Sequence, residues 1–453
     1  MSTTLEIRRE LRPTLALAFP IIVGHMSQML IGLTDSAFIG RVGTVPLAAA
    51  AFTNGVFGTF YVVGIGLLLG AGVYAARDHG AGDEVGCAAW LRHGRALALV
   101  VGLGALGLMG LLSTQLAHFG QPPEVVAIVR LFFLLIAASV VPALVFQMQR
   151  QFAESLGQPW VPMAIILADV GLNALLNWVL VFGHLGCPPL GLVGSGLATL
   201  CARLAAVAAL HLWLRHSRHF AVVRAARWTG WEKARFVQLL RLGGPAGGML
   251  LFEAGIFSAA ALMMGWLGTV ALAAHQIALG CASFAFMFPL GMSMAVSLRI
   301  SRAHGEGRPE AVRAIGFGAL AMGLVYMAGC ALVFVLAGRA LTAGFTPALD
   351  VAALATRLLV VAAFFQLFDG GQVISVGALR GLHDVRVPTV ITFVAYWVIS
   401  LPIGYGLAFH TALGPVGVWV GLALGLGIAA VLLSWRFHHK TRLRPEPAVP
   451  HVN

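Results

Sequence analysis

Twelve long apolar runs constrain the fold of this 453-residue chain more than any other feature of its sequence. Each run has roughly the 20 residues or more that a helix needs to cross the hydrocarbon core of a bilayer. Because backbone groups in lipid must form their hydrogen bonds within the protein, these runs are expected to be α-helical. The sequence therefore predicts an all-α polytopic membrane protein, with spans near residues 13–38, 46–74, 95–116, 125–147, 160–183, 191–214, 238–264, 269–298, 313–337, 349–378, 387–409 and 414–435.

The composition excludes several other classes of protein. Charged residues make up 10% of the chain, whereas a soluble domain has about 25%, so an ordinary soluble enzyme is excluded. The formal net charge of +12 is spread thinly between the apolar runs, and no nucleic-acid partner is expected. The five cysteines include no C-x-x-C pair, which indicates small core residues rather than a disulfide framework or a metal site.

Basic residues in the connectors predict how the chain is oriented in the membrane. When residues at the entry of a span are counted with the adjoining connector, the two tails and the even-numbered connectors hold 24 Lys and Arg residues, Arg150 among them, and the opposite side holds only Arg41 and Arg339. Three more, Arg130, Arg203 and Arg357, lie within the spans. Since cytoplasmic loops carry the excess of Lys and Arg, both termini are expected in the cytoplasm. That orientation requires an even number of spans, and twelve satisfies it.

An internal repeat divides the chain into two halves. Residues 225 positions apart match without gaps over the first part of each half, among them Pro20 with Pro245, Gly43 with Gly268, Gly66 with Gly291 and His79 with His304. The repeat predicts two six-helix bundles with the same orientation: an N-terminal lobe (1–214), a basic cytoplasmic linker (215–237), a C-terminal lobe (238–436) and a cytoplasmic tail (437–453). A binding cavity between two such halves is the usual plan of a transporter.

Of the 17 acidic residues, 13 lie in connectors or at span ends, and four lie within the predicted spans: Asp35, Asp169, Glu253 and Asp369. A carboxylate that faces lipid costs about 2.5–3.5 kcal/mol on an insertion scale, so these side chains are expected to face a cavity or a partner. Protons or small cations would compete for them there. Glu253 and Asp369 belong to the second half, where two nearby carboxylates would form a Na⁺ site or a coupled proton pair. The role of Asp169 stays open.

Asn173 and Asn177 have the i, i+4 spacing that places two side chains on one face of a helix. They share the first half with Asp35 and are candidates for its partners, although amides at membrane depth also serve as helix-packing hydrogen bonds. The only lysines, Lys233 and Lys440, have no preceding glycine, so the chain contains no phosphate-binding loop of the G-x-x-x-x-G-K-[ST] type. An ion gradient is therefore the expected energy source. Neither catalytic residues nor a cofactor is expected, apart from Na⁺ or H⁺ as the coupling ion.

Several motifs carry a resemblance to a known family. They are the stretch from Pro20 through Gly32-Leu33-Thr34-Asp35, the run Gly171-Leu172-Asn173 followed by Asn177, the segment from Leu272 to Leu279 that contains Gln276, and Arg380-Gly381. At these positions the sequence closely resembles the multidrug and toxic compound extrusion (MATE) family, and within it the NorM-like branch of bacterial efflux pumps. The resemblance covers nearly the whole chain, and its most specific part is the segment from Leu272 to Leu279.

The resemblance implies roles for residues of the first half. Asp35 matches the acid that the family carries on its first helix, and Pro20 matches the proline at which that helix bends. Asn173 and Asn177 resemble the partners of that acid on the fifth helix. Asp35, Asn173 and Asn177 are therefore expected to take part in cation or substrate binding. Pro20 is expected to be the position at which the first helix bends.

The resemblance also implies a cation site in the second half. Glu253 and Asp369 match carboxylates implicated in cation coupling, and Gln276 belongs to the eighth-helix motif of the binding region. Where relatives can carry a tyrosine four residues before the helix 10 acid, this chain has Phe365. Its ring face can contact a cation, but a hydroxyl ligand is missing. The identity of the coupling ion, Na⁺ or H⁺, therefore stays open.

The function expected from these features is efflux of bulky apolar or cationic drugs by an antiporter with alternating access. Such a protein would act as a monomer in the lipid of a bacterial inner membrane. A lipid-linked precursor flippase of the same superfamily is the alternative, and its anionic substrate would call for a cavity rich in Arg or Lys. A major facilitator carrier is disfavoured because residues 77–86 lack the loop pattern of that class. A membrane enzyme is disfavoured because no nucleophile with a positioned base is visible.

Overall fold

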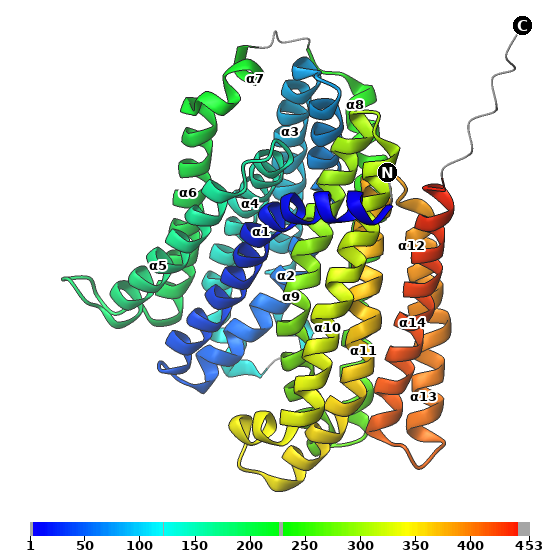
Figure 1. The fold of residues 1–453 in the computed structure, drawn as a ribbon. Coiled ribbons are helices and arrows are strands. Elements are labelled where there is room, and N and C mark those ends of the chain that lie inside the picture. The colour runs from blue at the N-terminus through cyan, green and yellow to red at the C-terminus, as the bar shows by residue number, and fades with distance from the viewer. Residues whose placement is uncertain (1–2, 121, 226–229, 443–453) are drawn as a thin grey trace, which may run out of the picture. The chain divides into compact units, whose positions relative to one another are not determined.

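The computed structural model describes residues 3–120, 122–225 and 230–442, which are almost entirely helical and contain no β-strand (Figure 1). In these residues 12 helical segments are long and apolar enough to cross a membrane, as the sequence predicts. They are α1 (Thr3–Gly40), α2 (Thr44–Gly80), α3 (Glu84–Leu112), α4 (Pro123–Ser155), α5 (Trp160–Phe182), α6 (Gly191–His216), α8 (Lys233–Trp266), α9 (Thr269–Gly305), α10 (Pro309–Phe345), α11 (Leu349–Gly381), the composite α12 (Arg386–Phe393), η3 (Val394–Ser400) and α13 (Leu401–Phe409), and α14 (Pro415–Lys440).

The short elements lie in the connectors. Two 3-10 turns, η1 (Leu116–Phe119) and η2 (Arg218–Phe220), precede α4 and the five-residue helix α7 (Ala221–Ala225). In the composite span the middle segment η3 is a π-helix. Most of the long helices extend beyond the predicted spans because polar residues at their ends continue the helix outside the apolar window.

The helix bounds confirm the internal repeat. α2 and α9 both have 37 residues, and each follows a glycine with positive φ, 155° at Gly43 and 116° at Gly268. L-residues with a side chain rarely adopt these angles, so both halves require glycine at the same turn. α4 and α11 both have 33 residues, and α6 and α14 both have 26. The sequence repeat is therefore a repeat of backbone architecture.

The described chain divides into two compact units, Leu17–Phe257 and Met1–Ala16 with Ser258–Asn453. The boundaries between the units fall inside α1 and inside α8 rather than in the predicted linker (215–237). Four linker residues (226–229) and most of the predicted tail (443–453) lie outside the described residues. The predicted lobe boundaries therefore stay a prediction.

One helix is central to each unit. In the unit Leu17–Phe257, α4 packs along α2, α3 and α6, and α5 packs on α6. In the other unit, α11 packs along α9, α10 and α14. α4 and α11 are counterparts in the repeat, and both have long runs of buried residues in their carboxyl-terminal halves. The repeat therefore preserves which helix forms the centre of the packing.

α4 carries a buried ion pair that also supports α1. Arg150 donates from Nε to Glu154 Oε1 at 2.6 Å, and the two side chains are 2% and 5% exposed. Its Nη2 donates to the carbonyl oxygen of Ile21 at 3.3 Å. A Cβ added to Gly24 would lie 3.0 Å from the same nitrogen, so glycine lets the guanidinium lie close to α1. Arg150 is thus a buried residue of α4 and not, as the sequence count assumed, part of a connector.

The amino-terminal part of α1 belongs to the unit that contains Ser258–Asn453, and ion pairs hold it there. The buried Glu10 carboxylate accepts from Arg299 of α9 and, at 2.9 Å, from Arg308. Arg308 also pairs with Glu306 at 3.1 Å. Burial would raise the pKa of Glu306, but hydrogen bonds from Arg302 and Arg308 outweigh burial and lower it. These contacts place residues before Leu17 with the second unit.

The Arg150–Glu154 pair predicts a large loss of stability when one partner is neutralised. Glu154→Gln leaves the buried guanidinium without a counter-charge and is expected to lower the free energy of unfolding by about 3–5 kcal/mol. Thermal unfolding of the purified protein in detergent measures the loss. Glu306→Gln is the matched control, because an exposed ion pair contributes only about 0–1 kcal/mol. Equal losses in the two variants would contradict this account.

Candidate functional site

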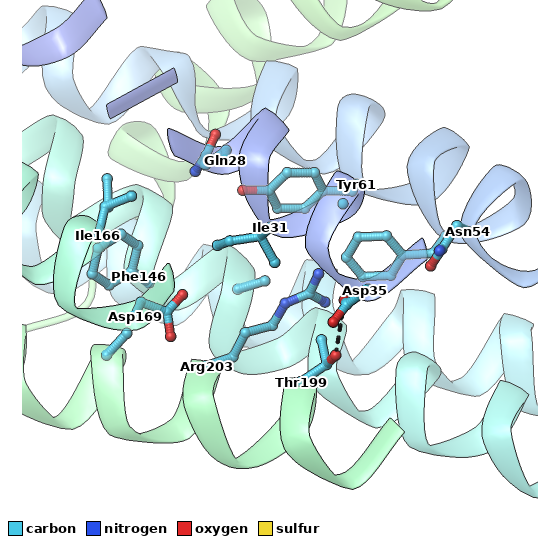
Figure 2. A pocket seen from close by; sticks show the side chains of 14 residues that line it. Gln28, Ile31, Asp35, Asn54, Tyr61, Phe146, Ile166, Asp169, Thr199 and Arg203 are labelled. Atoms are coloured by element: carbon cyan, nitrogen blue, oxygen red, sulfur yellow. Dashed lines mark hydrogen bonds between the residues drawn. The ribbon is translucent and has the colours of Figure 1, made fainter. Parts of the chain in front are cut away.

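The unit Leu17–Phe257 contains a cavity of about 270 Å³ that we call the Asp35 pocket (Figure 2). Five helices, α1, α2, α4, α5 and α6, contribute its walls, which are mainly apolar with a few polar and charged groups. The lining residues are Gln28, Ile31, Gly32, Asp35, Asn54, Phe57, Tyr61, Ala143, Phe146, Ile166, Asp169, Thr199, Arg203 and Ala206.

The Asp35 carboxylate receives a hydrogen bond at each oxygen. Asn177 Nδ2 donates to Oδ1 at 2.8 Å, and Thr199 Oγ1 donates to Oδ2 at 3.2 Å, as Figure 2 shows for the second bond. The Asp35 side chain is 8% exposed. Burial disfavours the charge of a carboxylate, whereas two donors favour it. In this geometry, burial and the two hydrogen bonds therefore have opposite effects on the ionisation of Asp35.

Asn173 and Asn177 are both buried on α5, on the face that the i, i+4 spacing predicts. Asn177 Nδ2 also lies 3.2 Å from Asn173 Oδ1, and Asn173 Nδ2 lies 3.5 Å from the hydroxyl oxygen of Thr199. The structure thus brings the three predicted polar residues of the first half together. Thr199 of α6 completes the network and has no separate signal in the sequence.

Arg203 is the charged residue of the pocket to which the sequence analysis gave no role. Its Nη1 donates to Ser139 Oγ at 2.6 Å, and its guanidinium carbon lies 4.3 Å from the centre of the Phe57 ring. It interacts electrostatically with both Asp35 and Asp169, and Figure 2 shows its side chain reaching toward Asp35. A cation within a membrane span is as costly as an acid. The position of Arg203 within a predicted span is therefore the sequence signal that marks it as a functional candidate.

Asp169 also lines the Asp35 pocket, on α5 one turn before Asn173. The pocket therefore combines two carboxylates with one guanidinium. The structure thus places Asp169, whose role the sequence leaves open, in the same pocket as Asp35.

In the other unit Asp369 and Phe365 are buried one turn apart on α11, 4% and 1% exposed. The Phe365 ring packs edge-on against Trp419 at 5.4 Å between centroids, and His275 packs edge-on against the same indole at 5.7 Å. His275 is therefore packed against the same aromatic side chain as Phe365. Gln276, the next residue of α9, is exposed.

The predicted carboxylate pair of the second half is divided between the two units. Glu253 is half-buried on α8 within Leu17–Phe257, and Asp369 belongs to the other unit. Among the described residues, His79, Glu84 and Cys87 form a group of possible metal ligands, with ligand atoms within 4.8 Å of one another. Glu253 and Asp369 are not part of it, and their Na⁺ site stays a prediction.

Comparisons with known proteins agree with the fold and the motifs. The sequence profile of the MatE family matches residues 20–179 and 245–406. "Probable multidrug resistance protein NorM" of Mesorhizobium japonicum is 37% identical over 98% of this chain and 97% of its own length. "Multidrug resistance protein NorM" of Burkholderia vietnamiensis is 36% identical over 96% of this chain and 95% of its own length.

Solved structures show the same fold at low sequence identity. The eukaryotic MATE transporter AtDTX14 has a TM-score of 0.86 at 19% identity, over 96% of this chain and 99% of its own. A MATE protein in the bent conformation has a TM-score of 0.87 at 19% identity, over 97% and 98%. The family profile and the full-length relatives establish the relationship that the motifs indicate. The chain belongs to the MatE, or multidrug and toxic compound extrusion, family of membrane transporters, which are not enzymes.

Proposed function

We propose that this protein is a multidrug efflux antiporter that exports bulky apolar or cationic compounds in exchange for H⁺ or Na⁺. Its membership of a transporter family and its full-length relatives named for multidrug resistance support this function. It would act as a monomer in the bacterial inner membrane with both termini in the cytoplasm, as the distribution of Lys and Arg indicates. Alternating access of the two lobes would move the substrate.

The observation that carries the proposal is the buried Asp35 carboxylate between an amide and a hydroxyl donor. Apolar side chains of Ile31, Phe57 and Phe146 line the same cavity. A carboxylate in such surroundings attracts a cation, and the apolar walls accept a hydrophobic body. A proton or Na⁺ that takes the charge of Asp35 removes the attraction for the drug. Binding of the ion and of the drug would thus exclude each other.

The charges of the Asp35 pocket suggest how many cations it takes. With Asp35 and Asp169 ionised and Arg203 protonated, the three side chains carry one net negative charge. One proton or one monovalent cation neutralises it. A cationic drug would compete with the proton or Na⁺ for the same charge.

The charge of the pocket also bears on the alternative, a lipid-linked precursor flippase. An anionic pyrophosphate would need several cationic side chains around it. The Asp35 pocket offers one guanidinium against two carboxylates. This balance favours a cationic substrate and therefore the drug exporter.

Helix α1 is the element through which Asp35 could act on the rest of the unit. Pro13 and Pro20 both lack a backbone N–H, so α1 bends more easily at these two positions, and Pro20 is the nearer of the two to Asp35. Arg150 contacts the carbonyl of the next residue, Ile21. Loss of the charge on Asp35 would loosen the bonds of α1 to Asn177 and Thr199 while the contact to α4 persists. The bend at Pro20 would then change.

Asp35→Asn tests the central role of the carboxylate. The amide cannot ionise, so ion-driven turnover is expected to fall at least about 100-fold, as for loss of an essential proton-transfer group, while apolar drugs still bind. Drug efflux from proteoliposomes and drug binding are measured on the same purified variant. Asp350→Asn, an exposed Asp at the start of α11, is the matched control. Near-normal turnover of Asp35→Asn would remove Asp35 from the mechanism.

Glu253→Gln and Asp369→Asn test the coupling carboxylates inferred for the second half. Each variant is expected to lose gradient-driven efflux while its expression and melting temperature stay close to those of the parent protein. Everted vesicles with Na⁺ and pH gradients imposed separately show which ion drives the parent protein. If both variants export drug at the normal rate, the second-half assignment is wrong.

Arg203→Gln tests the balance of charge in the pocket. Asp35 and Asp169 would then face each other without a cation, and the free energy of unfolding at neutral pH is expected to fall by about 1–3 kcal/mol. Adding Asp169→Asn removes one carboxylate and should restore part of the loss, because neighbouring charges are not additive. Melting temperatures of the two single variants and the double variant measure the coupling. Strict additivity would show that Arg203 does not act on Asp169.

A further inference from the structure

A second cavity of about 340 Å³ lies in the unit Leu17–Phe257, and we call it the arginine pocket. Its lining includes five basic residues: Arg92, Arg95, His211, Arg215 and Arg224. They come from the first turns of α3, the last turns of α6 and the short helix α7. None of these residues belongs to the Asp35 pocket, and the proposed transport mechanism does not use them.

Helical spacing explains why the basic side chains converge. Arg92 and Arg95 follow Ala88 and Leu91 on one face of α3, and Arg215 lies one turn after His211 on α6. α3 and α6 both pack on α4 rather than along each other, which leaves a space between them. α7 packs on α3 and closes this space at the end of the helices. The pocket is therefore a product of the fold.

The pocket holds positive charge that no lining carboxylate balances. Its described lining residues include neither Asp nor Glu. Arg224 is fixed at the end of α6 because its Nη1 donates to the carbonyls of Leu214 at 3.2 Å and Ser217 at 2.6 Å. Arg95 is half-buried, and its Nε is buried without a hydrogen-bond partner among the described residues. Four guanidinium groups around one cavity repel one another unless an anion lies between them.

The surroundings of the pocket identify the kind of anion. Its apolar wall includes Leu91, Leu214 and Phe220. Further along the same helices, exposed apolar side chains face outward, including Val100 and Leu103 on α3, 67% and 58% exposed, and Leu204 on α6, 49% exposed. The basic residues lie at the end of the helices that the distribution of Lys and Arg places in the cytoplasm. An anion that binds these basic residues would have its charge at the cytoplasmic end of the helices and apolar side chains beside it. A molecule with a charged group and an apolar body in these positions is an amphiphile of the inner leaflet.

We propose that the arginine pocket binds a phosphate-bearing anion, namely the phosphodiester headgroup of an anionic phospholipid, whose acyl chains lie along α3 and α6. Basic pockets between membrane helices on the cytoplasmic side bind such headgroups. Arginine suits the role because its planar fork pairs with two phosphate oxygens at once. A bound lipid would fill the space between α3 and α6 and tie both helices to α7. Free phosphate has the same chemistry, so the experiment separates the two sources.

The test uses the full-length purified protein after delipidation. Binding of phosphatidylglycerol, phosphatidylcholine and inorganic phosphate is measured by native mass spectrometry and by the shift of the melting temperature. The triple variant Arg92→Gln, Arg95→Gln, Arg215→Gln is expected to bind phosphatidylglycerol about 100-fold more weakly, at about fivefold for each arginine. Its lysine counterpart keeps the charge and should retain most of the binding. Arg8→Gln, Arg9→Gln, Arg12→Gln removes the same charge from exposed residues of α1 and is the matched control.

Each result bears on the proposal. Preference of the parent protein for phosphatidylglycerol over phosphatidylcholine, lost in the pocket variant and kept in the control, supports a lipid site. Displacement of phosphatidylglycerol by inorganic phosphate at millimolar concentration supports an anion site that free phosphate fills. Equal binding of the two lipids without binding of phosphate, or an equal loss in the control variant, overturns the proposal. If the glutamine triple variant does not fold, Arg95→Gln alone and the lysine variant decide by the same measurements.

Discussion

A charge buried within a bilayer must find its hydrogen bonds and its counter-charge inside the protein, and this constraint determines the arrangement of the unit Leu17–Phe257. Asp35 meets it with donors from α5 and α6, and Arg150 meets it with Glu154 and a carbonyl of α1. These bonds connect α1 to three other helices. The groups proposed to bind a cation are thus the same groups that hold the first helix in place. Under the proposed function, a change in the charge of Asp35 would change the packing of α1.

The repeat conserves the backbone but not this chemistry. The 225-residue repeat makes Ala260 the equivalent of Asp35, and the paired starts of α5 with α12 and of α6 with α14 give Ile399, Ile403 and Ala423 for Asn173, Asn177 and Thr199. None of the four can replace the hydrogen bonds of the first half. The counterpart of α5 is also interrupted by the π-helix Val394–Ser400. The hydrogen-bond network of Asp35 is therefore built in the first half only.

The number of membrane helices, the repeat and the grouping of Asp35 with Asn173 and Asn177 could be predicted from the sequence. Apolar runs, matched glycines and i, i+4 spacing are local signals, and each reflects a physical requirement of a helix in lipid. Thr199 and Arg203 could not be placed, because their roles depend on α6 lying beside α1 and α5. Arg150 was misplaced because a buried ion pair with Glu154 looks in sequence like the polar end of a span. Contacts between segments that are far apart in the sequence leave no local pattern from which they could be predicted.

The two ends of α1 belong to different units, and this arrangement follows from two sets of polar contacts. Glu10 accepts from Arg299 and Arg308 in one unit, and Asp35 accepts from Asn177 and Thr199 in the other. Pro20 lies between them, a few residues after the boundary at Leu17. A helix held at both ends responds to a weakened contact at one end by bending where its own hydrogen bonds are fewest. Pro13 and Pro20 both lack an N–H, and Pro20 is the one that shares a unit with Asp35. Under the proposed function, a change of charge at Asp35 is therefore expected to alter the bend of α1 at Pro20.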